Sequence, residues 1–315
     1  MDVLRDINLF QLFDHLTQSD EDFDEWLKDL GLLHKRRTCT RCGNNSMRMY
    51  GTCGTRTGRK WTCNRRPCRE SGSKMRIGFY ADTFFEGSHL GPKKVLHLSY
   101  FYLHEIGTLA QMEYEVGITH QAAVQWTQWI RDFFALFFIA KPRQIGGPGV
   151  VVVIDKTSIS HRKYNNGKIA GYERRWLFGG IECGSNLGFL TLVDSHNANN
   201  LLPIIQQYVK PGSIIHSDLC EEYGGTETLP EGYRQLKVNQ SINFVDTKSG
   251  GHTQGTENKW CRFKRRQKAH GLSADDGEQR NNYLQEFMWR QQFNERSQIM
   301  YNFWSQVAEL YPCER

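Results

Sequence analysis

Residues 150–155 read VVVVID, an unbroken run of β-branched residues that ends in an aspartate. Such a run is typical of a strand that is buried on both faces of a sheet. Downstream, RRWLFGGIEC (174–183) and LGFLTLVDS (187–195) predict two more strands, ANNLLPIIQQYV (198–209) predicts a helix, and GSIIHSD (212–218) predicts a fourth strand. The order of these elements indicates an α/β domain built on a mixed sheet.

The predicted first and fourth strands end in Asp155 and Asp218, and these carboxylates are expected to lie side by side. A right-handed crossover returns the fourth strand beside the first, parallel to it and about 4.8 Å away. Close carboxylates repel unless a cation offsets them, and magnesium prefers oxygen ligands. The pair therefore predicts a divalent-metal site. Asp194, two strands away, is expected to cap the following helix instead.

Glu257 is the only carboxylate in HTQGTENKWCRFKRRQK (252–268), where six lysines and arginines surround it. A helix through this stretch puts Trp260 and Lys264 on the same face as Glu257. We expect Glu257 to complete the metal site; the alternative is that it only neutralises a neighbouring base on a solvated helix. The bases expected to face phosphates are Arg262, Lys264 and Arg265.

Five of the nine cysteines fall within residues 39–68, an arrangement that points to metal rather than to disulfides. The motifs CTRC and CNRRPC offer two close pairs, which can meet around one tetrahedral ion. The glycines and alternating side chains between them predict the hairpin strands of a zinc ribbon, in which zinc is structural. Cys53 lies between the pairs as a competing ligand. The four predicted zinc ligands are Cys39, Cys42, Cys63 and Cys68.

The segment from about residue 90 to 140 is helical and aromatic. The stretch TLAQMEYEVGITHQAAVQWTQWI predicts two helices joined by a turn at Gly117, with Thr119 as the cap of the second. This pattern fits a helix-turn-helix in which Gln121 and Gln125 read bases in the major groove of DNA. The alternative is a small helical bundle that only packs.

Charge is segregated along the 315 residues behind a net charge of +6. Residues 1–34 hold nine acids and two bases, whereas residues 35–76 hold thirteen bases and one acid. Local basicity of this kind is commonly built to neutralise phosphates, so DNA is the expected partner; the alternative is a solvated basic face. The further residues expected to contact the DNA backbone are Arg65, Arg66, Arg162 and Lys163.

The chain is long enough for more than one domain. We expect an N-terminal helical segment (1–36), a zinc ribbon (37–78), a helix-turn-helix domain (79–145) and a catalytic domain (146–315). No apolar run approaches the ~18 residues of a transmembrane helix, and acids stand where a signal peptide needs a basic start. The sequence thus predicts a soluble, intracellular protein with no membrane partner.

The chain from about residue 150 onward resembles the transposase domain of Merlin-type elements, the ISXO2-like branch of the DDE transposases. The likeness rests on ordered motifs, and more weakly on a zinc ribbon over residues 20–75. The motifs are VVVIDKTSISHRKYN, RRWLFGGIE, LLPIIQQYVKPGSIIHSD, VNQSINFVD, GHTQGTENKW and LQEFMWRQQF.

This resemblance implies an RNase H-like fold and cut-and-paste transposition of double-stranded DNA, by end cleavage and strand transfer at terminal inverted repeats. The family's three acids fall on Asp155, Asp218 and Glu257, its downstream base falls on Lys264, and Lys156 departs from an acid usual in relatives. The implied mechanism uses two magnesium or manganese ions. We expect a homodimer or higher oligomer on DNA.

Two other functions stay open: a domesticated transposase that binds DNA without cutting it, and a structure-selective nuclease on the same fold. Intact acids at the three matched positions argue against the first, and strand-transfer assays separate the second. The basic runs HKRR and KRRQK serve either nuclear import or DNA binding. A eukaryotic host implies the nucleus, and a bacterial host the cytoplasm or nucleoid.

Overall fold

The computed structural model divides the chain into two compact units. Unit 1 comprises Met1–Ile130 and Phe293–Arg315, and unit 2 comprises Arg131–Gln292. The residues that the structure describes are 1–45, 47–51, 58–70, 75–165, 168–185, 187–195, 197–217, 223, 225–237 and 277–315. Within these ranges, no helix combines the length and the apolar character that crossing a membrane requires.

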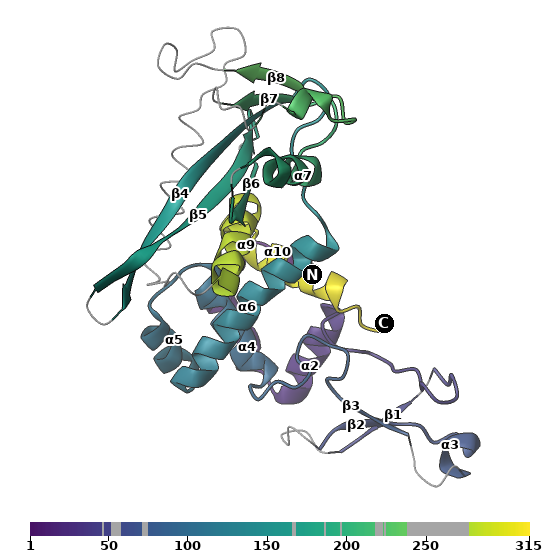
Figure 1. Ribbon diagram of the computed structural model, residues 1–315. Helices are drawn as coiled ribbons and strands as arrows, with labels where there is room; N and C mark the ends of the chain where they lie inside the picture. Colours follow the sequence, from purple (N-terminus) through teal and green to yellow (C-terminus); the bar gives the residue numbers. More distant parts are fainter. Residues whose placement is uncertain are drawn as a thin grey trace. The chain divides into compact units, whose positions relative to one another are not determined.

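Unit 2 is built on a five-stranded mixed sheet (Figure 1). Its strands lie in the order β6-β5-β4-β7-β8; β6, β5 and β4 are antiparallel neighbours, and β7 and β8 run parallel to β4. The predicted return of the fourth strand beside the first is thereby confirmed, as is the RNase H-like mixed α/β fold. The strands are β4 (Val151–Asn165), β5 (Lys168–Glu182), β6 (Gly188–Val193), β7 (Ile214–Ser217) and β8 (Arg234–Lys237).

The core of unit 2 explains why this sheet forms. Val152 and Ile154 of β4 are buried with Phe178 and Phe189 from the neighbouring strands. Two helices, α7 (Ala198–Tyr208) and α9 (Gly277–Phe293), add apolar side chains to the same cluster. Gly180 leaves the space that the ring of Phe189 fills, since a Cβ there would come within 2.7 Å of that ring.

Two expected boundaries in unit 2 were wrong. The first strand does not end at Asp155, because β4 continues for ten residues, to Asn165, in antiparallel pairing with β5. Asp194 does not cap the next helix: the side chain of Asn197 does so, accepting a hydrogen bond from the backbone N–H of Asn200 at 3.1 Å. Asn197, which is three residues closer to the helix than Asp194, therefore occupies the N-cap position.

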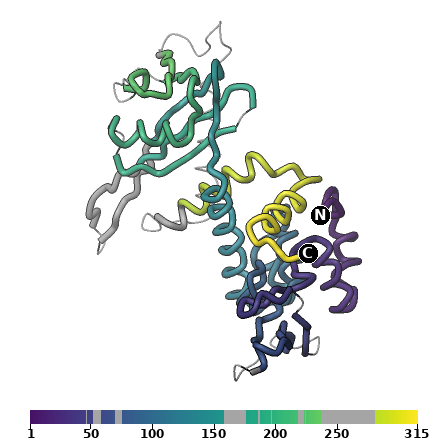
Figure 2. The backbone as a smooth tube through the Cα atoms, turned by 90° about the vertical axis from the view of Figure 1, so that its right-hand side faces the viewer, coloured from purple at the N-terminus to yellow at the C-terminus, as the bar shows by residue number. Residues whose placement is uncertain are grey.

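Unit 1 is mainly helical, and both ends of the chain belong to it (Figure 2). Aromatic rings join its parts: Phe84 lies 6.0 Å from Trp126, 6.2 Å from Phe303 and 5.6 Å from Trp304, between ring centroids. Its helices are η1 (Asp2–Leu4), α1 (Leu9–Leu16), α2 (Asp20–Asp29), α3 (Arg66–Glu70), α4 (Pro92–Leu103), α5 (Leu109–Val116) and α10 (Ile299–Leu310); α6 (His120–Ala140) runs on into unit 2.

A small antiparallel sheet, order β1-β2-β3, carries the expected hairpin strands of the ribbon. Its central strand buries Trp61, whose ring lies parallel to that of Phe79. The strands are β1 (Arg48–Tyr50), β2 (Lys60–Thr62) and β3 (Arg76–Gly78).

Candidate active site and metal centre

Asp155 lies in β4. The strand β7, which the crossover connection returns to the sheet, is the parallel neighbour of β4. The parallel register pairs Val153 with His216, so Asp155 comes two residues beyond the last pair that joins these strands. Its Oδ1 accepts a hydrogen bond of 2.7 Å from the backbone N–H of Lys156, which orients the half-buried carboxylate. Beside it, β8 supports the end of β7, because Gln235 donates to the hydroxyl of Ser217 at 2.9 Å.

The other predicted active-site residues are not all within the described chain. Asp218 follows Ser217 directly in the sequence, but it lies outside the described residues, as do Glu257, Lys264 and the neighbouring bases Arg262 and Arg265. Arg162 and Lys163 lie in β4, where their backbones pair with those of Tyr172 and Gly171 in β5. Of the three acids, the structure therefore positions Asp155.

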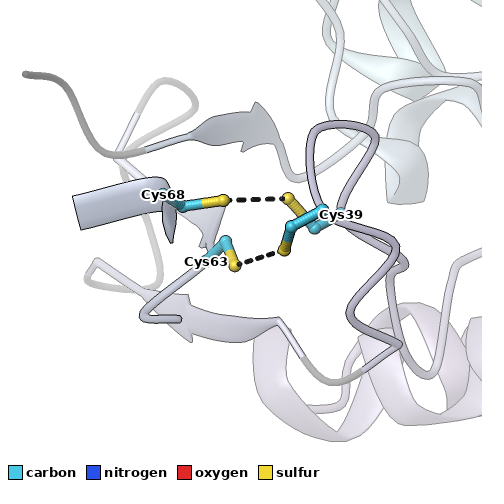
Figure 3. A group of neighbouring side chains, drawn as sticks. Cys39, Cys63 and Cys68 are labelled. Carbon is cyan, nitrogen blue, oxygen red and sulfur yellow. Dashed lines mark hydrogen bonds between the residues drawn. The ribbon is translucent and has the colours of Figure 1, made fainter. Parts of the chain in front are cut away.

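The four predicted zinc ligands meet in one place. Figure 3 shows Cys39, Cys63 and Cys68 with their sulfurs directed toward a common centre. The Sγ atoms of Cys39 and Cys68 are 3.7 Å apart, as are those of Cys42 and Cys63, and all four lie within 4.8 Å of one another. All four are free cysteines, and Cys39, Cys63 and Cys68 are buried.

This geometry fits a tetrahedral metal ion. Zinc–sulfur bonds of ~2.3 Å in a tetrahedron separate the sulfurs by about 3.8 Å, close to the observed spacing and far beyond a disulfide bond. Four sulfurs this close also favour a cation electrostatically once they are thiolates, because thiolates repel one another without one. Zinc bound there would hold together a segment that has little core of its own.

Local backbone structure brings the two cysteine pairs together. Residues 39–44 form a tight turn in which Gly43 takes a φ of +68° and its N–H bonds to the carbonyl of Cys39. Burial raises the pKa of the Cys39 thiol, but hydrogen bonds from the backbone N–H groups of Cys42 and Arg41, together with those from the thiols of Cys42 and Cys68, lower that pKa to about 7. The turn thereby favours the thiolate that a metal requires.

A strand end and a short helix position the second pair, Cys63 and Cys68. Cys63 follows β2, and Cys68 lies in the short helix α3, where its N–H donates to the carbonyl of Arg65. This helical turn explains the wider spacing in CNRRPC. Burial, together with the neighbouring thiols, raises the pKa of Cys68 to about 12, so a cation is needed to hold it as a thiolate. Cys53, the proposed competitor, lies outside the described residues.

Asn44 is a neighbour of this site that the sequence did not single out. Its side-chain amide lies 3.9 Å from the sulfur of Cys63 and accepts a hydrogen bond from Arg65 at 3.4 Å. The position of Asn44 just after the first pair was the only available signal. Arg65 and Arg66 are both exposed beside the cluster.

The predicted helix pair forms as expected in its backbone. The helix α5 ends at Gly117 in the left-handed conformation, with φ of +64°, and the hydroxyl of Thr119 accepts from the N–H of Ala122 at the start of α6. Gln121 and Gln125 are exposed on α6. His120 has a structural contact that the sequence did not reveal, a 2.7 Å pair with Glu113.

Comparisons with known proteins match this chain within unit 2. The model of the ISXO2-like transposase domain family matches residues 150–292. An uncharacterized transposase-like protein of Haemophilus influenzae is 30% identical over 103 residues, which cover 32% of this chain and 78% of that protein.

Among solved structures, the HTLV-2 integrase catalytic core domain in complex with magnesium is similar in its trimeric form, with a TM-score of 0.29, 12% identity and coverage of 47% of this chain and 87% of that one. Its dimeric form gives a TM-score of 0.30 and 13% identity, with coverage of 45% and 86%. The domain match and the transposase-like relative establish that the chain belongs to the ISXO2-like family of DDE transposases.

Proposed function

We propose that this chain catalyses cut-and-paste transposition: it cleaves the ends of its element in double-stranded DNA and joins them to a target. The observation that carries the proposal is the family match over residues 150–292, because that range contains all three acids predicted from the sequence. Asp155, Asp218 and Glu257 are the proposed magnesium or manganese ligands.

The proposed chemistry follows from what three carboxylates brought together beside β4 and β7 would hold. Asp155 fits a hard cation, since it offers carboxylate oxygens on a strand that the core fixes. Two ions held by the three acids would supply an activated water and would stabilise the leaving oxygen of an in-line displacement. In this scheme Lys264 binds the scissile phosphate, and Arg162, Lys163, Arg262 and Arg265 hold the adjoining backbone.

The remaining parts are proposed to hold the DNA. The zinc ribbon binds through Arg65 and Arg66, and α6 presents Gln121 and Gln125 to the major groove of the terminal repeat. Because an element has two ends, each needing an active site, we propose a homodimer or higher oligomer on DNA. Its proposed compartment is the nucleus in a eukaryotic host and the cytoplasm or nucleoid in a bacterial host.

The test uses conservative variants that remove charge but keep shape. Asp155→Asn, Asp218→Asn and Glu257→Gln should each abolish magnesium-dependent cleavage and strand transfer on a duplex that carries the element's terminal repeat, while binding to that duplex stays within about twofold. The assay measures cleaved and joined products on sequencing gels, and binding by fluorescence anisotropy.

Asp194→Asn is the matched control, because Asp194 is exposed and follows β6, two strands from β4. It should cleave like the wild type. Undiminished cleavage by the Glu257→Gln protein in magnesium would contradict the assignment.

A further inference from the structure

The strand register gives the three-stranded ribbon sheet, β1-β2-β3 in Figure 1, two chemically different faces. Tyr50 pairs with Lys60, while Arg48 and Arg76 both pair with Thr62 from opposite sides. Directly opposed residues, and alternate residues along a strand, point to the same face of a sheet. One face therefore carries Arg48, Tyr50, Lys60 and Arg76 together; we call these four residues the ribbon face.

The opposite face is the packed one. It carries Met49, Trp61 and Ile77, which pair with one another across the strands. Trp61 is buried, with its ring 6.4 Å from that of Phe79. Ile77 is half-buried and Met49 is 40% exposed, so burial on this face is concentrated at the central strand. All four residues of the ribbon face are exposed, whereas Thr62, which lies between the two arginines, is buried. The basic side chains of the ribbon face therefore face solvent.

Bases in this segment fall into two classes. Arg59 is mostly buried and forms an ion pair with Asp24, and Arg37 is buried and pairs with Asp82. The charges of Arg59 and Arg37 are therefore each paired with a carboxylate within unit 1. The side chains of Arg48, Lys60 and Arg76, in contrast, form no hydrogen bond or ion pair with the side chains and backbone that the structure describes. Their opposed partners, Thr62 and Gly78, carry no charge.

From this arrangement we propose that the ribbon face binds the phosphate backbone of duplex DNA, through Arg48, Lys60 and Arg76. The two arginines stand on the outer strands, about 10 Å apart at the backbone, with Lys60 on the strand between them. Long side chains at this spacing reach separate phosphates, and no carboxylate on the face competes for them.

Tyr50 extends the ribbon face toward Arg65. Its hydroxyl accepts a 2.7 Å hydrogen bond from the side chain of Asn64, the residue before Arg65. That bond links the ribbon face to the segment that carries Arg65. Contacts of this kind position the duplex without reading bases, so this binding is independent of sequence. The inference rests on the proposed function only in taking DNA as the partner.

The experiment is a salt titration of the full-length, zinc-loaded chain on a fluorescently labelled duplex of random sequence. Arg48→Ala/Arg76→Ala should lower the slope of log affinity against log salt by about two, and adding Lys60→Ala should lower it by about one more. At low salt the triple variant should bind on the order of a hundredfold more weakly. Each variant's zinc content reports that the ribbon is intact.

Arg5→Ala/Lys35→Ala is the charge-matched control, since these exposed bases already pair with Asp2 and Asp29. It should keep the wild-type slope, as should Arg48→Lys/Arg76→Lys. The inference is overturned if the triple variant keeps the wild-type slope. It is also overturned if the control lowers the slope as much as Arg48→Ala/Arg76→Ala does.

An end-cleavage assay distinguishes failure of the ribbon-face inference from failure of the catalytic proposal. If the wild type cleaves ends but the triple variant keeps its slope, only the ribbon-face inference fails. If the slope falls as expected but the wild type never cleaves, only the catalytic proposal fails. A wild type that does not bind duplex DNA overturns both.

Discussion

At the scale of single residues, the pair Arg59–Asp24 shows how the acidic N-terminal segment is used. Asp24, in α2, is 5% exposed, and its carboxylate pairs with the guanidinium of Arg59, which also lies 4.0 Å from the ring centroid of Phe79. The excess of acids in residues 1–34 does not show which of them are buried. Asp24 is buried, and the ribbon's Arg59 gives its carboxylate a partner.

Arg59→Ala should therefore lower the free energy of unfolding of unit 1 by about 3 kcal/mol, since it leaves a buried carboxylate unpaired. Lys35→Ala is the matched control: it breaks a pair with Asp29 whose side chains are both exposed, and it should cost about 0.5 kcal/mol or less. Urea unfolding at neutral pH measures both. Equal losses would show that burial of Asp24 contributes nothing.

The same residue predicts a pH dependence. Burial raises the pKa of Asp24 above its ordinary value of 3.8, although the hydrogen bond and charge of Arg59 oppose the rise. Stability from a raised carboxyl pKa is fully present below pH 3.8 and is lost as pH rises through the folded-state pKa. The stability of the wild type relative to Asp24→Asn should fall over that window. Urea unfolding across acidic pH measures this difference, in which metal loss common to both proteins cancels; a constant difference would contradict the prediction.

At the scale of elements, the ribbon depends on its cysteines more than on its core. Cys39→Ser/Cys63→Ser removes one thiolate from each pair, so bound zinc should fall from one per chain to none and the ribbon should unfold. Metal analysis and the fluorescence of buried Trp61 measure the two effects. Cys313→Ser is the control, because Cys313 is half-buried outside the cluster and should leave zinc unchanged. Full zinc in the double variant would show that the site is misassigned.

How far the sequence predicts these elements depends on the strength of the local signal. The apolar runs of β6 and β7 were identified correctly, because burial demands apolar residues. The two cysteine pairs also meet as expected, since close pairs of thiols on separate turns are a specific local signal. The strand β8, with the sequence RQLK, was missed: its polar, short stretch pairs through backbone hydrogen bonds with β7. Asn44 was missed because spacing alone does not show which amide turns toward a sulfur. In the candidate site, the predicted strand order was enough to place Asp155 near β7, because β4 and β7 are parallel neighbours whose pairing ends two residues before Asp155.

At the scale of the whole molecule, unit 1 needs both ends of the chain. Glu314 accepts hydrogen bonds from the backbone N–H and hydroxyl of Thr38, at 3.1 Å and 2.8 Å, and Trp304 of α10 is fully buried against Phe84 and Phe85. Nothing in the sequence signalled this return of the chain. Because α10 comes last in the chain, the core of unit 1 is completed only after residues 131–292 have been made.

Two buried tryptophans allow the independence of the units to be tested. Trp304 belongs to unit 1, whereas Trp289 belongs to unit 2, where its ring stacks on Phe134 at 4.5 Å. Each Trp→Ala change leaves a large cavity and should cost about 3–5 kcal/mol in its own unit. Calorimetry of the zinc-loaded chain should then show Trp304→Ala lowering the transition in which zinc is released, and Trp289→Ala lowering the other. If either variant moves both transitions equally, the chain unfolds as one cooperative body and the division into units has no thermodynamic meaning.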